Sequence, residues 1–208
     1  MKNTNHSLFD KYEMIKDLGT GSSGSVTLVR HISMDQERAL KKVPKASAFA
    51  ESALSEARLL KSLEHPSIPR IFDFEEDDAF YYIVEEYIDG ETLDSFLLHQ
   101  QLISPGLFFN ICEQLCNVFI YLHTQISTPI IYRDLKPEHI IVCHNKLKLI
   151  DFGVSAYVIQ DGNNFNHYGN IEFSAPECFT EDTITPAADI YSLGQLLQYI
   201  PVSYTHLR

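Results

Sequence analysis

Two acidic residues, separated by one hydrophobic stretch, define the chemistry that this chain can perform. Asp134 lies in the polar segment Tyr-Arg-Asp-Leu-Lys-Pro-Glu-His, residues 132–139, and Asp151 begins the tripeptide Asp-Phe-Gly. A carboxylate on a polar loop can accept a proton from a hydroxyl group. A second carboxylate, between two strands, can hold a divalent cation because hard cations prefer oxygen ligands. Together the two acids have the chemistry that moving a phosphoryl group requires.

A glycine-rich segment near the N-terminus is suited to contact phosphate. Residues 18–26 read Leu-Gly-Thr-Gly-Ser-Ser-Gly-Ser-Val, which is the pattern G-x-G-x-x-G-x-V. Glycine lets backbone N–H groups approach phosphate oxygens without a side chain in the way. A plain Gly/Ser hairpin would give the same pattern, and a dinucleotide-binding fold would require a helix directly after the glycines. Residues 26–29 instead predict a strand, which favours a two-stranded flap over phosphates.

These segments, taken in order, resemble the glycine-rich, catalytic and metal-binding loops of protein kinases. The resemblance runs from about Phe9 to Ile200 and includes Ala-Leu-Lys at 39–41, Ala-Pro-Glu at 175–177 and Asp-Ile-Tyr-Ser-Leu-Gly at 189–194. It implies that the γ-phosphate of ATP is transferred to a hydroxyl group of a protein. Lys136 is typical of serine/threonine kinases, and Tyr132, where histidine is commoner, resembles bacterial members.

The resemblance assigns a role to each candidate catalytic residue. Asp134 resembles the base that orients the substrate hydroxyl, and Lys136 resembles the lysine that steadies the transferred phosphate. Lys41 would bind phosphate oxygens, with Glu56 to fix it, since Glu56 lies on an expected helix that precedes His-Pro as in the family. The neighbouring Lys42 is expected to point to solvent.

The expected cofactors are ATP and Mg²⁺, or Mn²⁺ in its place. Asp151 is the metal-binding candidate, because Mg²⁺ prefers oxygen ligands near 2.1 Å. By resemblance, Glu86 and Ile88 would offer backbone contacts to adenine, and Val26 and Ile141 would lie on either side of the base. The expected nucleotide-binding residues are Leu18, Gly19, Gly21, Gly24, Val26, Ala39, Lys41, Glu86, Ile88 and Ile141.

The sequence departs from the family at three positions. His139 stands where the family has a metal-binding asparagine, and its nitrogen suits Mn²⁺ better than Mg²⁺. Asn170 stands where the family has a threonine that contacts the catalytic acid. The amide of Asn170 could make that contact in place of the threonine. Glu85 occupies a position that is usually apolar or small, and a buried carboxylate needs a partner. These departures leave a pseudokinase, an ATP-binding scaffold or sensor without turnover, as the alternative function.

A small-molecule kinase on the same scaffold is a further alternative. Two features count against it, the Lys136-Pro137 pair and the segment Ala175-Pro176-Glu177, because small-molecule kinases generally lack that peptide-docking segment. The expected partner is therefore a protein that presents a Ser or Thr hydroxyl.

The order of the expected elements predicts an α+β, two-lobe fold of the protein-kinase type, with a β-rich N-lobe and a mainly helical, incomplete C-lobe. The N-lobe is expected over 9–88 and a partial C-lobe over 89–200, and 201–208 resembles a non-native tail on a C-terminally truncated domain. Apolar patterning predicts strands at 12–18, 25–31, 38–43, 70–74 and 80–86 around a helix at 48–63. Beyond the hinge at Asp89-Gly90, helices are expected at 92–98, 105–123 and 187–200, and strands at 140–142 and 147–150.

Composition limits the kinds of partner and the cellular compartment that suit this chain. The 208 residues include 28 acids and 16 bases, and the formal charge of −12 argues against nucleic acid as a partner. No stretch approaches the roughly 18–20 uninterrupted apolar residues that a membrane span requires. The polar start of the chain does not resemble a secretory signal. The four cysteines lack metal-ligand spacing. Cys112 and Cys116, four positions apart in an apolar helical pattern, could form one face of a site, but they are expected as small buried side chains. The domain is expected to be cytoplasmic, although the full-length protein could be membrane-tethered.

Overall fold

The chain forms two compact units in a computed structural model that describes residues 8–21, 24–100, 102–157, 170–180 and 184–201. The first unit comprises the chain up to Glu64 together with Pro69–Tyr87. The second comprises His65–Ile68 and the chain from Ile88 onward. Strands dominate the first unit and helices the second, so the predicted α+β class and the kinase-type division into a β-rich and a helical part are confirmed.

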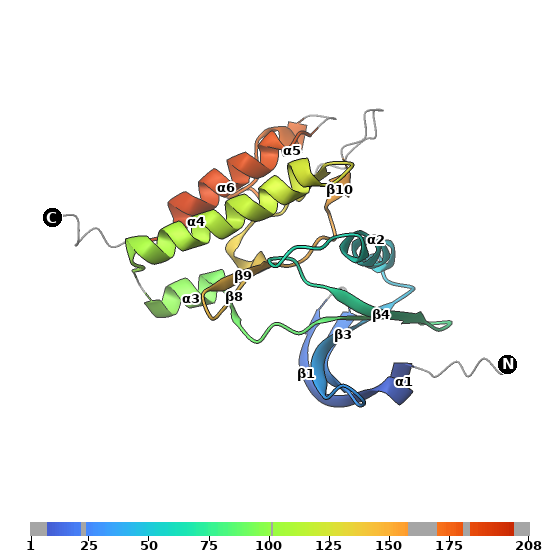
Figure 1. Cartoon of the computed structure of the whole chain (residues 1–208). Helices are drawn as coiled ribbons and strands as arrows, with labels where there is room; N and C mark the ends of the chain where they lie inside the picture. The colour runs from blue at the N-terminus through green and yellow to red at the C-terminus, as the bar shows by residue number, and fades with distance from the viewer. Residues whose placement is uncertain (1–7, 22–23, 101, 158–169, 181–183, 202–208) are drawn as a thin grey trace. The chain divides into compact units, whose positions relative to one another are not determined.

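A five-stranded antiparallel sheet forms the first unit (Figure 1), with strand order β1-β2-β3-β5-β4. The alternation of apolar residues predicted all five strands, and the fold extends most of them by a few residues. Asp77 closes the tight turn between the last two strands, because its Oδ1 accepts the N–H groups of Ala79 and Phe80 at 2.8 and 2.7 Å. The strands are β1 (Tyr12–Gly21), β2 (Gly24–His31), β3 (Gln36–Pro44), β4 (Ile71–Glu76) and β5 (Phe80–Glu86).

One helix, α2 (Ala50–Lys61), packs against this sheet. Its small residues Ala53 and Ala57, four positions apart on one face, form a core cluster with Val43 of β3 and Ile83 of β5. The same face carries Glu56, which is also buried. The predicted helix at 48–63 is therefore present with slightly shorter bounds, and its buried face holds a charged side chain among alanines and leucines.

A short helix that the sequence did not predict, α1 (Leu8–Lys11), precedes β1. Leu8 is fully buried in a cluster with Tyr12 and Tyr82, among other side chains of the sheet. The Lys11 ammonium group pairs with Asp73 of β4 at 2.8 Å. Four residues carry no periodic signal, so only these contacts with distant strands identify the element.

Helices form most of the second unit. The long α4 (Pro105–Ile120) begins at Ser104, whose Oγ accepts the Leu107 N–H at 3.2 Å, and it continues into the π-helical turn η1 (Tyr121–Gln125). In Figure 1 α4 runs beside α6 (Ala187–Tyr199), with which it is in contact. The remaining helices are α3 (Leu93–Gln100), α5 (Glu177–Thr180) and the 3₁₀ turn η2 (Pro137–His139).

Short strands in the second unit carry the polar loops. β8 (Ile140–Cys143) and β9 (Lys146–Leu149) form a hairpin whose two turn residues, His144 and Asn145, have φ of 48° and 63°. Two positive φ values are the signature of a tight type I′ hairpin turn. The other strands are β6 (Glu91–Thr92), which pairs with β8, and β7 (Ile130–Ile131), which pairs with β10 (Ala156–Tyr157).

The C-terminal residues are described only as far as Pro201, whose carbonyl accepts the Ile103 N–H at 3.0 Å. The rest of the tail predicted to be non-native, 202–208, lies outside the described residues. Within the residues that the structure describes, no helix combines the length and the apolar character that crossing a bilayer requires.

Candidate active site

In the first unit the candidate phosphate-binding lysine meets an acid. Lys41 lies on β3, with Val26 and Ile83 as its cross-strand neighbours, and its ammonium group is 2.7 Å from the Glu56 carboxylate on α2. The two side chains are 19% and 8% exposed. An isolated charge at this depth would lose its hydration without compensation, and here each group is the counter-charge of the other. The structure thus brings together the pair that the sequence proposed.

The neighbouring lysine does not point to solvent as expected. Lys42 is half-buried, and its ammonium nitrogen lies 4.0 Å from the centre of the Phe80 ring and 5.8 Å from that of Tyr82. A cation over an aromatic face is attracted by the ring quadrupole. Strand alternation therefore sends two adjacent lysines to opposite faces, one to an acid and the other to aromatic rings.

The three glycines of the predicted flap have different surroundings. Gly24 has φ of 142°, and a Cβ added there would lie 2.1 Å from the Lys42 carbonyl oxygen, so the close approach of β2 and β3 requires glycine. A Cβ on Gly19 or Gly21 would meet no atom within 4 Å. The fold therefore explains Gly24, whereas the space beside the other two glycines is open.

The remaining predicted nucleotide-binding residues belong to both units. In the first unit Leu18 is partly exposed on β1, Ala39 is buried on β3 opposite Glu85, and Glu86 donates its N–H to the Arg70 carbonyl at 2.9 Å. In the second, Ile141 is half-buried on β8 and the Ile88 carbonyl accepts the Gly90 N–H at 3.0 Å.

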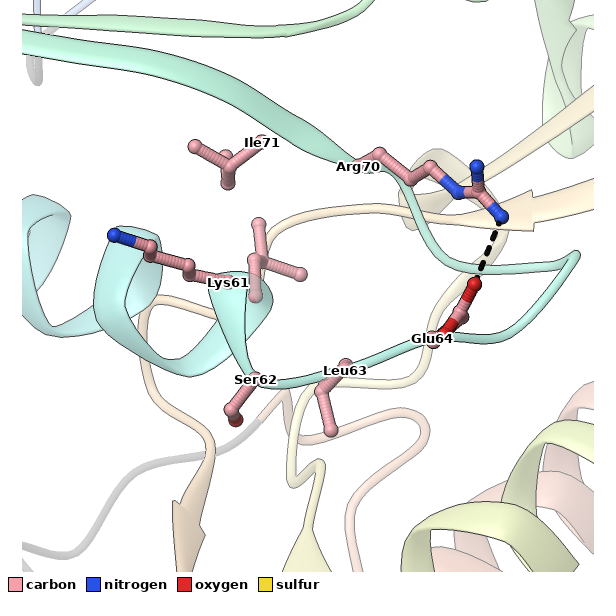
Figure 2. Close-up of a pocket in the computed structure, with 7 residues that line it drawn as sticks. Lys61, Ser62, Leu63, Glu64, Arg70 and Ile71 are labelled. Atoms are coloured by element: carbon pink, nitrogen blue, oxygen red, sulfur yellow. Dashed lines mark hydrogen bonds and ion pairs between the residues drawn. The ribbon is translucent and has the colours of Figure 1, made fainter.

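A hollow of about 300 Å³ in the first unit lies at the end of α2 (Figure 2) and contains none of the predicted site residues. Figure 2 shows the exposed ion pair of Arg70 and Glu64, 3.3 Å apart, at its edge. It is lined by Leu60, Lys61, Ser62, Leu63, Glu64, Arg70 and Ile71.

In the second unit a remote buried acid holds the catalytic loop. Asp189 on α6 is fully buried and accepts the backbone N–H groups of Tyr132 and Arg133, both at 2.8 Å. Its Oδ2 also lies 2.8 Å from Nε2 of His123. This buried acid therefore braces the backbone of the catalytic loop. His123 was missed because nothing local in the sequence connects it to a residue 66 positions away.

The candidate base is bonded to two side chains of its own loop. Lys136 Nζ lies 3.0 Å from Oδ2 of Asp134, and His139 Nδ1 lies 3.3 Å from the same oxygen. His139 Nδ1 is also 3.0 Å from the backbone carbonyl oxygen of Asp134. The Asp134 side chain is only 5% exposed, so these contacts fix the direction in which its carboxylate faces.

The candidate metal ligand lies on the other side of His139. Asp151 has φ of 61°, and its Oδ1 accepts the Gly153 N–H at 3.2 Å, while its Oδ2 lies 3.5 Å from His139 Nε2. Its carboxylate is 52% exposed and can reach a cation in solvent. Among the described residues no group of three or more His, Cys, Asp or Glu side chains gathers as a metal cluster. The two side chains predicted to hold a metal are nevertheless adjacent.

Tyr132 connects this loop to the Asp-Phe-Gly segment. Its hydroxyl donates to the Ile150 carbonyl, directly before Asp151, and its ring lies edge-on to Phe152 at 5.0 Å. Ser155 Oγ donates to the Tyr132 carbonyl at 3.1 Å. A tyrosine where histidine is commoner thus adds a hydroxyl contact that links the two polar loops.

Among the described residues, the Asn170 amide does not make the contact with the catalytic acid Asp134 that the family's threonine makes. The Asn170 side-chain oxygen accepts the Glu172 N–H at 2.8 Å, and its own N–H donates to Ser174 Oγ at 2.8 Å. No hydrogen bond joins it to Asp134 within the described ranges. The Asn170 side chain instead closes a turn within its own segment, as Asn side chains commonly do. Residues 158–169 of this segment, including Tyr168 and Gly169, lie outside the described residues.

All four cysteines are free thiols in this fold, and only Cys178 is buried. Cys112 and Cys143 are partly exposed and Cys116 is exposed, so the expectation that Cys112 and Cys116 are buried was wrong for Cys116 and only partly met by Cys112. Burial raises the pKa of the Cys178 and Cys112 thiols above the usual 9.0.

Comparison with known proteins identifies relatives of this arrangement. A family model described as the protein kinase domain matches residues 12–206. The chain is 31% identical to serine/threonine-protein kinase PrkC of Bacillus subtilis, with 90% of this chain and 30% of that protein covered. It is 33% identical to serine/threonine-protein kinase ppk25 of Schizosaccharomyces pombe (88% and 44% covered) and 29% to serine/threonine-protein kinase PknB of Mycolicibacterium smegmatis (93% and 32%). The chain thus spans less than half the length of each of these relatives.

Proposed function

The chain belongs to the protein kinase domain family, and from this premise we propose that it transfers the γ-phosphate of ATP to a Ser or Thr hydroxyl of a protein substrate. The observation that carries the proposal is Asp134, a nearly buried carboxylate that is held on one oxygen by Lys136 and His139. The names of the relatives support serine and threonine as the acceptors. Residues 9–88 would form the N-lobe and 89–200 the C-lobe of this domain.

The proposed chemistry begins at Asp134. Its carboxylate orients the substrate hydroxyl towards the γ-phosphate and accepts the hydroxyl proton as the new O–P bond forms. The bond from the γ-phosphorus to the oxygen that bridges it to the β-phosphate breaks in the same step, and ADP is the leaving group. Lys136, bonded to the same carboxylate, is near enough to neutralise charge on the transferred phosphate. Since both groups lie on one short loop that Asp189 fixes, their geometry is set before the substrate binds.

Lys41 supplies a second positive charge in this proposal. The Glu56 carboxylate holds its ammonium group at a fixed place on β3, which prepares it to bind phosphate oxygens of ATP. Gly19 and Gly21 would present backbone N–H groups to the phosphates, and the open space around them leaves room for the ligand. Leu18, Gly24, Val26, Ala39, Glu86, Ile88 and Ile141 would complete the nucleotide contacts.

A divalent cation is part of the proposed reaction, and the side chains present fit one. Mg²⁺ is commonly held by one or two protein ligands together with substrate phosphates and water, so a cluster of three protein ligands is not required. Asp151, with its half-exposed carboxylate, and His139 would hold the ion. When bound, the cation would neutralise charge on the phosphates of ATP.

The proposal also concerns the setting of the domain. Its phosphate donor and its four free thiols suit the cytoplasm, where ATP is supplied and thiols stay reduced. The partner is a protein that presents a Ser or Thr hydroxyl.

The direct test is transfer of labelled γ-phosphate from ATP to the chain itself and to a generic Ser/Thr substrate, with Mg²⁺ and Mn²⁺ in parallel. We expect transfer by the wild type and its loss in Asp134→Asn, which keeps the shape of the side chain but removes the base. ATP binding without transfer in either metal would contradict the proposal and favour a pseudokinase.

A further inference from the structure

A second hollow, of about 450 Å³, lies in the second unit, where α3 and the end of α6 line it. It contains none of the residues assigned to phosphate transfer. Its volume is within the range of pockets that hold small organic ligands, about 300–1,000 Å³. The hollow is therefore a candidate site for a ligand other than ATP. The residues that line it are Asp94, Leu97, Leu98, Tyr199 and Pro201.

Contacts within the second unit hold the two sides of this hollow in place. The Ile103 N–H, in the segment after α3, donates to the Pro201 carbonyl at 3.0 Å, and Ile103 is itself buried. The Tyr199 ring makes an edge-to-face contact with the buried Phe173 ring, with 5.8 Å between the ring centres. Because these contacts already fix both sides, less binding free energy is lost to ordering them when a ligand enters.

Asp94 brings a carboxylate into this largely apolar lining. Its Oδ1 is shielded from solvent, and no described residue donates a hydrogen bond to it. By contrast, the carboxylate of Glu91, three positions earlier, lies 2.9 Å from Nδ1 of His99. The helix dipole favours an acid in the first turn of α3, but it supplies no hydrogen-bond donor to the shielded oxygen. Since a charge partly removed from water is stabilised by a counter-charge, the group that suits the Asp94 carboxylate is a cation.

We propose that this hollow binds a small organic amine, with its ammonium group beside the Asp94 carboxylate and its apolar body against the leucine side chains of α3. The Tyr199 ring suits the same ligand, because an aromatic ring attracts a cation and also packs well on an apolar body. The formal charge of −12 on the chain favours a cation over an anion in the same way. The proposal concerns binding and does not rest on phosphate transfer.

The probe for this site is phenethylamine, which carries an ammonium group at neutral pH on a short aromatic body. Two compounds of similar shape separate charge from size: phenethyl alcohol is neutral and hydrocinnamate is negative. Binding to the full chain is measured by titration, with NMR detection of the backbone amides of Leu97 and Leu98. We expect a Kd of roughly 0.1–1 mM for the amine, as is typical of a ligand with few atoms. The alcohol should bind at least about tenfold more weakly, because a charge-assisted contact is lost, and hydrocinnamate should not bind.

Two substitutions test whether the amine occupies this hollow. Asp94→Asn keeps the shape of the side chain without its charge, and should bind phenethylamine and phenethyl alcohol equally. Leu98→Lys changes an exposed residue one helical turn from Asp94, so that the new ammonium group can pair with the carboxylate and compete with the probe. We expect this variant to bind the amine at least about tenfold more weakly, without a fall in Tm. Glu91→Gln is the matched control, because the Glu91 carboxylate already contacts His99, and it should bind the amine as the wild type does.

Several results would overturn this assignment of the hollow. The wild type would show no saturable binding of phenethylamine up to about 10 mM, or would bind the alcohol as tightly as the amine. Unchanged affinity for the amine in both Asp94→Asn and Leu98→Lys would place the probe elsewhere on the chain. If the free amine failed to bind but a lysine-containing peptide shifted the same backbone amides, the hollow would be a docking site for a protein, and the proposal of a small-amine site would fail.

Discussion

The two units hold their candidate functional groups in different ways. In the first unit, Lys41 and Glu56 come from a regular strand and a regular helix, and the strand register and helix face bring them within 2.7 Å. In the second unit, Asp134, Lys136 and His139 lie on a loop and a 3₁₀ turn, and the loop backbone is held by Asp189 more than 50 positions away. Groups on regular elements are placed locally, whereas groups on loops depend on remote buried partners.

The largest effect is expected where the loop depends on its remote partner. Asp189→Ala would leave two backbone N–H groups and His123 without their buried acceptor, so the free energy of unfolding should fall by about 3–5 kcal/mol. Urea denaturation measures this change. Asp189→Asn keeps one acceptor oxygen and should lose less. A loss below about 1 kcal/mol in the alanine variant, the size of a single ordinary hydrogen bond, would show that the loop is held by other contacts.

The second-largest effect is expected on the rate of phosphate transfer, with the fold unchanged. Lys41→Met removes the ammonium group but keeps a long apolar side chain, and should lower kcat by about 10²–10³-fold because one preorganised positive charge is lost. Phosphate-transfer kinetics measure the change, and circular dichroism confirms the fold. Lys42→Met is the matched control on the opposite face of β3. A loss of rate in the control that matched that of Lys41→Met would contradict the assignment.

The glycines test the comparison within the first unit. Gly24→Ala should lower the free energy of unfolding by about 1–3 kcal/mol, because its φ of 142° is strained for a side chain and the added Cβ would collide with the Lys42 carbonyl. Gly21→Ala should change it by no more than about 0.5 kcal/mol, since no atom lies near the added Cβ. Thermal or urea unfolding distinguishes the two. Equal losses would mean that both glycines are structural.

The smallest effect is expected on the pH dependence of the free energy of unfolding, through His65 in the second unit. Burial, with a further contribution from the positive charge of Lys148, lowers the pKa of His65 below its usual 6.5. The unfolded chain therefore binds this proton more readily than the folded chain, so stability is complete above pH 6.5 and falls as the pH decreases towards the lower folded-state pKa. Unfolding curves between pH 7 and 5 measure this. His65→Gln should remove that part of the pH dependence, and an identical pH profile in the variant would count against it.

Spacing and residue type predicted much of the fold. The five strands of the first sheet, α2 and the long helices were anticipated from periodicity, because the apolar faces of such elements repeat at 2 or 3.6 residues. The four-residue α1 and the two-residue strands β6, β7 and β10 were not predicted. Elements this short have no period, and contacts with distant residues decide whether they form.

The candidate site shows the same contrast between what the sequence predicted and what depended on contacts with distant residues. The motifs in the sequence identified Lys41, Glu56, Asp134, Lys136, His139 and Asp151, and with them the family. The sequence did not predict that Lys42 lies on aromatic rings, that Asn170 serves its own turn or that His123 contacts Asp189. Side-chain partners depend on direction as well as on identity, and a sequence specifies only identity.

By itself the sequence determined which chemical groups the protein has and the order in which they occur, and these are enough to place it among the protein kinases. Only the tertiary structure decided that one imidazole contacts both Asp134 and Asp151, and that His123 shares the buried Asp189 carboxylate with the backbone of the catalytic loop. The physical reason is the short range of these interactions. A hydrogen bond acts over about 3 Å, so residues that are distant in the chain become partners only after folding has brought them together.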